Sequence, residues 1–126
     1  MATLQVNAAD VALVRCDSAG GARSFPAAAA IDAGRVVALD SRGRATSSGT
    51  NIEGIAVTSA KQAGASLDVI REGIVDLGDA LSALAFGAAV YASPDGTLDD
   101  ATGTEIGRVT ASNGEIPSRK LLRVEV

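Results

Sequence analysis

The sequence predicts an all-β (mainly β) domain, and three observations lead to this fold class. Short segments rich in Val, Ile and Leu recur along the chain between turns that contain glycine. One turn pattern occurs twice, 53 residues apart. The best candidate for a helix, Asp79–Leu84, is too short for more than about two turns. We therefore expect a small β-barrel or sandwich, because such folds protect their edge strands.

The repeated unit is a strand, a turn and a second strand. Four pairs of glycines have the 53-residue separation, where chance predicts about one such pair: Gly20 with Gly73, Gly34 with Gly87, Gly43 with Gly96, and Gly54 with Gly107. The apolar pattern after the third glycine is not reproduced, since Ile55 corresponds to Arg108. We expect the duplicated halves at about residues 31–78 and 84–126.

A single domain is expected, because 126 residues supply one hydrophobic core. The chain divides into an extended N-terminal arm, residues 1–30, and a β domain, residues 31–126. The core is thin, because 25 of the hydrophobic residues are alanine and only Phe25, Phe86 and Tyr91 are aromatic. Burial against another subunit or a larger surface would stabilise such a domain.

The arm contains a possible first strand and an ambiguous alanine run. Asp10–Arg15 alternates loosely between apolar and polar residues, and Ser18–Gly21 ends this pattern. Pro26 with Ala27–Ala30 fits a helical turn opened by proline, and it fits equally an extended segment leading to Gly34.

The first half of the β domain supplies strands at regular spacing. We expect strands at Arg35–Leu39 and Ile52–Thr58, where Val, Ile and Thr suit a pleated, half-buried surface. The longer segment Leu67–Leu77 contains Gly73, and a glycine inside a strand marks a bulge or a sharp bend. This segment is therefore expected to form two strands.

The second half begins with the one short helix that we expect. Leu81 and Leu84 are three residues apart, and Gly87 follows as a stop signal. The turn Ser93–Gly96 is favourable, because proline fixes its φ and glycine accepts a positive φ. The remaining expected strands are Ala88–Ala92, Glu105–Ala111 and Leu121–Val126.

Charge and hydropathy argue against two classes of partner. The net charge is −4, the pI is about 4.7 and the basic residues are scattered, so we expect no nucleic acid. No apolar run approaches the about 18 residues of a membrane span, and no signal-peptide pattern opens the chain. We expect a soluble protein that is not exported and has no membrane partner.

Catalytic and metal chemistry also find no support. The chain has no histidine, which removes the commonest general base and zinc ligand. Cys16 is the only cysteine, and Lys61 lies outside any Ser–Lys motif. Asp99 and Asp100 lack the spacing of a calcium loop, and the glycines form no phosphate-binding motif. We expect neither an enzyme nor a cofactor.

The segment from Ala28 to Val126 resembles the capsid cement, or head decoration, proteins of tailed bacteriophages. The resemblance rests on the order and spacing of five cues: Ala33–Asp40 with Gly43, Ile52–Ala56, Ile70–Gly73, Leu84–Tyr91 with Gly96, and Ile106–Val109.

This resemblance implies a structural virion protein without a reaction. Such proteins sit on the outer surface of the head, usually as trimers, where they bridge major capsid subunits and stabilise the mature shell. The implied partners are the major capsid protein and further copies in a homotrimer, and the protein would be made in the host cytoplasm. We assign the partner contacts to residues of the arm and to two aromatic side chains: Leu4, Val6, Arg15, Arg23, Phe25, Phe86 and Tyr91.

A β-fold binding module, such as a carbohydrate-binding or adhesive head or tail domain, is the alternative. Sugar-binding faces usually stack on Trp or Tyr, and Tyr91 is the only candidate of this kind.

Overall fold

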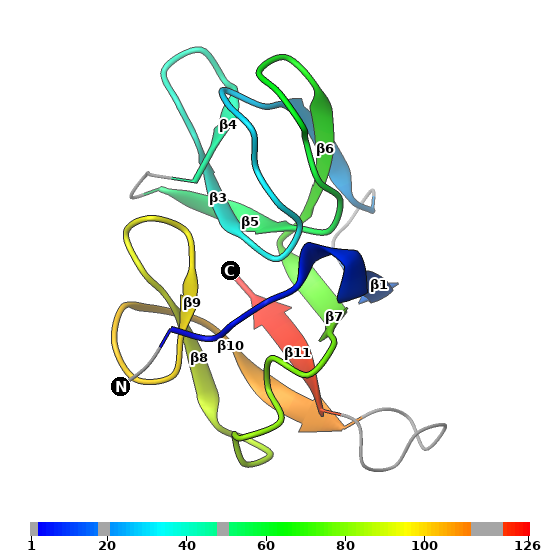
Figure 1. Cartoon of the computed structure of the whole chain (residues 1–126), viewed down its shortest axis with the longest axis vertical. Helices are drawn as coiled ribbons and strands as arrows, with labels where there is room; N and C mark the ends of the chain where they lie inside the picture. The colour runs from blue at the N-terminus through cyan, green and yellow to red at the C-terminus, as the bar shows by residue number, and fades with distance from the viewer. Residues whose placement is uncertain (1–2, 18–20, 48–50, 112–119) are drawn as a thin grey trace.

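The computed structural model describes residues 3–17, 21–47, 51–111 and 120–126 as two antiparallel β-sheets (Figure 1). Sheet A has six strands and lies in the lower part of Figure 1, and sheet B has five strands and lies in the upper part. The described strands do not close into a barrel. The all-β prediction is therefore confirmed in its sandwich-like form.

The two sheets have the same strand order. Sheet B contains, in spatial order, β2 (Arg23–Pro26), β6 (Ser66–Ile70), β5 (Ile52–Ala56), β3 (Val36–Leu39) and β4 (Ala45–Thr46). Sheet A contains β1 (Val11–Cys16), β7 (Glu72–Leu77), β11 (Lys120–Glu125), β10 (Thr104–Ala111), β8 (Ala89–Ala92) and β9 (Leu98–Asp99). Apart from β1, the strands of sheet A correspond in spatial order to those of sheet B: β7 to β2, β11 to β6, β10 to β5, β8 to β3 and β9 to β4.

The strand pairing confirms the duplication at the level of single residues. The paired positions of the two sheets coincide after a shift of 53 residues: Ala38–Thr46 and Tyr91–Asp99, Leu39–Ala45 and Ala92–Leu98, Val36–Ile55 and Ala89–Arg108, Val37–Gly54 and Val90–Gly107. Both units have a β-bulge at the same place. The turns also close alike, since Asp40 N–H donates to Arg44 O (2.9 Å) and Ser93 N–H donates to Thr97 O (2.8 Å).

The unit boundary differs from the one expected. In sheet B, β2 pairs with β6, and in sheet A, β7 pairs with β11 in the corresponding way. The first unit therefore runs over residues 23–70 and the second over residues 72–125, in place of halves at about 31–78 and 84–126. The segment Leu67–Leu77 does form two strands, with the break at Arg71. Gly20 and most of the turn Ser18–Gly21 lie outside the described residues.

The predicted helix at Asp79–Leu84 is wrong. These residues form consecutive turns, in which Ser82 N–H donates to Asp79 O (3.1 Å) and Leu84 N–H donates to Leu81 O (3.0 Å). Such a short segment forms too few hydrogen bonds to offset the free-energy cost of nucleating an α-helix. Leu81 is fully buried without one. The structure has instead a 3-10 helix at Ala8–Asp10. No helix in the described part of the chain is long and apolar enough to cross a membrane.

The segment expected as the N-terminal arm contains one strand of each sheet. β1 confirms the predicted first strand and lies at one edge of sheet A, and β2 lies at one edge of sheet B. Before β1, Leu4 N–H donates to Leu98 O (2.8 Å), and the segment crosses from β9 towards β1 (Figure 1). Ala27 bridges to Ala45, so the alanine run begins in the extended form.

Burial differs between the two sheets. Sheet B is buried on both faces: Val36, Ile55 and Ile70 belong to one core cluster with the inner face of sheet A, and Val37, Ala56, Leu67 and Val69 belong to a second. Sheet A buries its inner face, which carries Val75, Val90, Val109, Leu122 and Val124, whereas Arg108 and Arg123 are exposed on its outer face. Ile55 and Arg108 therefore differ because their shared position is buried in the first unit and exposed in the second.

Two aspartates close turns with their side chains. Asp40 Oδ1 accepts hydrogen bonds from the backbone N–H groups of Arg44 (2.9 Å) and Arg42 (2.8 Å). Asp99 Oδ1 accepts them from the N–H groups of Thr102 (3.1 Å) and Ala101 (2.9 Å). These backbone hydrogen bonds hold the pKa of both carboxyl groups below the ordinary value of 3.8.

We expect the thermal stability of the protein to fall in acid. A carboxyl group whose pKa is lower in the folded state stabilises that state above its unfolded pKa of about 3.9, and the contribution is lost as the pH falls through the folded pKa. Melting temperatures measured from about pH 6 to about pH 2 test this. Asp40→Asn and Asp99→Asn should each reduce the fall in melting temperature towards low pH. Asp79→Asn, at an exposed carboxylate, should leave this fall as it is in the wild type. If the melting temperature of both Asp40→Asn and Asp99→Asn fell in acid as much as that of the wild type, these two carboxyl groups would not be the cause of the acid sensitivity.

Candidate functional site

The expected contact residues Leu4 and Val6 pack on their own domain. Both side chains are half-buried against the core cluster of sheet A. A Cβ atom at Gly34 would lie 2.6 Å from Val6 Cγ1, so the glycine makes room for this valine. These two residues therefore fasten the N-terminal segment to the domain.

Arg23 and Phe25 lie together on β2. The Arg23 guanidinium lies 5.0 Å from the centre of the Phe25 ring, and the ring itself is buried in the second core cluster. Beside them, the Glu53 carboxylate accepts a hydrogen bond from Arg71 (3.1 Å) and lies 3.7 Å from the Arg23 guanidinium. Arg23 is thus exposed on a charged cleft of about 280 Å³, whereas Phe25 contributes to the core.

Phe86 and Tyr91 lie near opposite ends of β8. Phe86 is 51% exposed, and Lys120 Nζ lies 5.4 Å from the centre of its ring. Lys120 Nζ also donates to Ser82 O (3.1 Å) and to Leu84 O, so it joins this loop to the start of β11. Tyr91 is half-buried and pairs across the sheet with Glu105.

The exposed apolar residues of β1 were missed by sequence reasoning. Leu13 is 41% exposed and Val14 is 53% exposed. The pairing of β1 with β7 is interrupted between Leu13 and Arg15 by a bulge, in which Val14 has no partner position. A signal was present, because the unbroken apolar run Val11–Val14 lacks the alternation of a half-buried strand.

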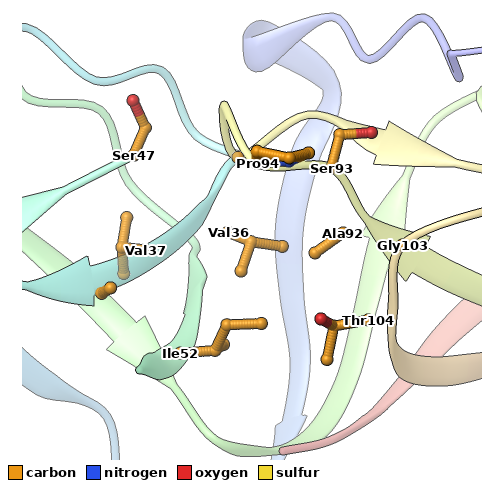
Figure 2. Close-up of a pocket in the computed structure, with 11 residues that line it drawn as sticks. Val36, Val37, Ser47, Ile52, Ala92, Ser93, Pro94, Gly103 and Thr104 are labelled. Atoms are coloured by element: carbon orange, nitrogen blue, oxygen red, sulfur yellow. The ribbon is translucent and has the colours of Figure 1, made fainter. Parts of the chain in front are cut away.

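A cavity of about 370 Å³ lies between the two units (Figure 2). Val36 and Ala92 point toward each other across it, and Ile52 and Thr104 lie below them (Figure 2). Val36 N–H donates to Gly96 O (2.9 Å), which ties β3 to the turn of the second unit. None of the described lining residues is aromatic or ionisable, so they offer neither a ring for sugar stacking nor an acid–base pair.

Metal-ligand geometry is also missing from the described residues, where no three His, Cys, Asp or Glu side chains form a group that could hold an ion. Asp99, which has the most buried acidic side chain described, serves as a turn cap. Arg15 is exposed and forms an ion pair with Asp17. The seven expected contact residues therefore do not form one site; they are distributed over the N-terminal segment, the edge strands β1 and β2, the loop before β8, and β8 itself.

A family model described as phage cement protein matches residues 18–117, which include β2 to β10. No curated protein matches the chain.

Proposed function

The chain belongs to the phage cement protein family, and on this premise we propose that it binds the outer surface of a phage capsid and bridges neighbouring major capsid subunits. Membership in the family implies a structural role at the capsid. The proposal adds a position on the outside of the mature head, a homotrimeric arrangement, and synthesis in the host cytoplasm before assembly. The role is mechanical and requires no reaction.

The observation that carries the capsid contact is the exposed apolar edge at β1. β7 occupies one side of this strand, and no described strand pairs with its other side. An edge strand of this kind offers backbone N–H and C=O groups to an extended segment of a partner. Leu13 and Val14 add apolar surface that such a segment would remove from water. An extended segment of the major capsid protein fits this edge.

An exposed apolar residue at a second place on the domain supports the bridging of two capsid subunits. Phe86 lies in the loop before β8, and in the order of sheet A, β8 is separated from β1 by β7, β11 and β10. Two contacts at different places on one small domain allow it to bind two neighbouring capsid subunits. Contacts that are weak singly add up when many copies occupy a lattice.

We expect Val14→Asp to weaken binding to the capsid by about tenfold or more, because a carboxylate in an apolar contact must be desolvated. Heads of the encoding phage, prepared without this protein, are mixed with the purified chain and sedimented. The wild-type protein should bind in a fixed ratio to the major capsid protein and raise the temperature of DNA release. Phe86→Asp tests the second contact in the same assay.

Ala101→Asp, in the exposed turn after β9, is the matched control for the added charge. All three variants should keep the wild-type melting temperature within a few degrees, since they alter exposed positions. Failure of the wild-type protein to sediment with the heads would refute the proposed function. Normal binding by Val14→Asp would refute the β1 contact alone.

A further inference from the structure

The outer face of sheet A carries two parallel rows of charged side chains. The register places one set of residues side by side across four strands: Arg15, Ile74, Arg123 and Arg108. We call this set the basic row for its three arginines; Ile74, between Arg15 and Arg123, is apolar and only 7% exposed. Two positions away along the chain from three of these residues lie Asp17, Glu72 and Glu125, and Glu105 lies three residues from Arg108, beside the bulge of β10. We call these four residues the acidic row. Opposite charges thus form adjacent stripes on one face.

The arginines of the basic row each have an acidic neighbour on the same strand. Arg15 pairs with Asp17 at 2.9 Å, Arg123 pairs with Glu125 at 2.9 Å, and Arg108 lies 3.9 Å from Glu105. These six side chains are between 39% and 70% exposed. The ion pairs hold the charged side chains in place, and these side chains remain accessible to a partner.

The strand geometry sets the dimensions of the pattern. From β1 to β10 the rows cross three strand spacings, which is about 14 Å. The two rows are separated by two residues along the chain at β1, β7 and β11, or about 7 Å. A partner must therefore present stripes of opposite charge with the same spacing.

The corresponding positions in sheet B are apolar and buried. Arg108 and Arg123 correspond to Ile55 and Ile70, which are 0% and 1% exposed. In the first unit this face is closed by the rest of the domain, and in the second unit it is open. A second layer of protein can therefore pack on this exposed face of sheet A.

We propose that this face of sheet A binds the same face of a second copy of the chain. A twofold axis that runs along the rows, midway between them, places the basic row of one copy over the acidic row of the other. Arg15, Arg123 and Arg108 then each face the acidic residue of the same strand in the second copy. A contact of this kind is isologous, so one surface supplies both of its sides. Charge complementarity selects a second copy, because a surface striped in this way complements itself.

This contact joins copies of the chain and does not depend on capsid binding. Exposed ion pairs are weak singly and are screened by salt, so the association is favoured at low ionic strength. We expect the sedimenting mass to at least double at about 0.02 M salt relative to about 0.5 M salt.

Two charge-reversed variants test the twofold arrangement. In Arg123→Glu, two carboxylates face each other across the contact, and in Glu125→Arg, two guanidinium groups do. Each variant alone should therefore lose about tenfold or more in association constant at low salt. An equimolar mixture should recover association to within about threefold of the wild type, because the acidic variant faces the basic one.

Sedimentation of each variant alone, of the mixture and of the wild type at both salt concentrations provides the measurement. Melting temperatures verify that both variants are folded. Recovery in the mixture supports the proposal, since each variant alone places like charges opposite each other at β11. A mixture that keeps the mass of the separate variants would overturn it, and so would single variants that associate like the wild type.

Discussion

Replacement of Ile55 by arginine will abolish cooperative folding, whereas replacement of Arg108 by isoleucine will leave stability nearly unchanged. The two residues occupy the same position of the two units, paired with Val36 in one and with Ala89 in the other. Ile55 is fully buried, and the Arg108 side chain is 70% exposed. A buried guanidinium without a partner costs about 5 kcal/mol or more, which is comparable with the stability of a small domain.

Urea unfolding followed by circular dichroism at 25 °C measures this difference. Arg108→Ile should change the free energy of unfolding by no more than about 0.5 kcal/mol, as exposed substitutions usually do. Ile55→Val, which keeps the position apolar, should cost about 1 kcal/mol and is the control for altered packing. A cooperative transition of Ile55→Arg near the wild-type midpoint would show that this position is not buried.

Alanine at Gly107 will destabilise the protein by about 3 kcal/mol or more, because its Cβ atom would overlap the backbone of the next strand. This atom would lie 2.0 Å from Arg123 O, and rotating a side chain cannot relieve such a contact. Gly54 occupies the same position in the first unit, and its Cβ would lie 2.1 Å from Ile70 O. Gly54→Ala should therefore have a similar effect.

Gly87→Ala is the matched control for these two variants. Gly87 has a φ of +87°, and a Cβ atom there would meet nothing within 4 Å. Its substitution should cost only about 1 kcal/mol, which is the backbone strain of a left-handed residue. Equal losses in denaturant unfolding for Gly87→Ala and Gly107→Ala would show that the close approach of the next strand does not set the cost at Gly107.

Most of the long strands and the duplication could be predicted from the sequence. Turns such as Ser93–Gly96 depend on the φ preferences of proline and glycine, which are properties of single residues. The short strands β4 and β9 were missed because two residues cannot show a period. β2 was missed because its proline and its single buried residue, Phe25, do not form a strand pattern.

Contact of the seven expected residues with a partner stays a prediction, and their exposure could be predicted only in part. Phe86 is exposed, as a contact residue should be, but Phe25 is in the core, and Leu4 and Val6 pack on their own domain. Composition identifies aromatic residues without telling which side of a sheet they lie on. The apolar run Val11–Val14 was a local signal for β1, but the exposure of Leu13 and Val14 depends on the place of this strand at the edge of sheet A.

The sequence by itself determined the turns, most of the strands, the 53-residue duplication and the family, because these depend on backbone preferences and on spacing along the chain. Only the tertiary structure decided which faces of the two sheets are buried and where the unit boundary lies. It also aligned Arg15 with Arg108 and Arg123 in one row, because strand pairing joins segments about a hundred residues apart. Such long-range pairing is set by the packing of the whole chain, and the residues next to each strand do not encode it.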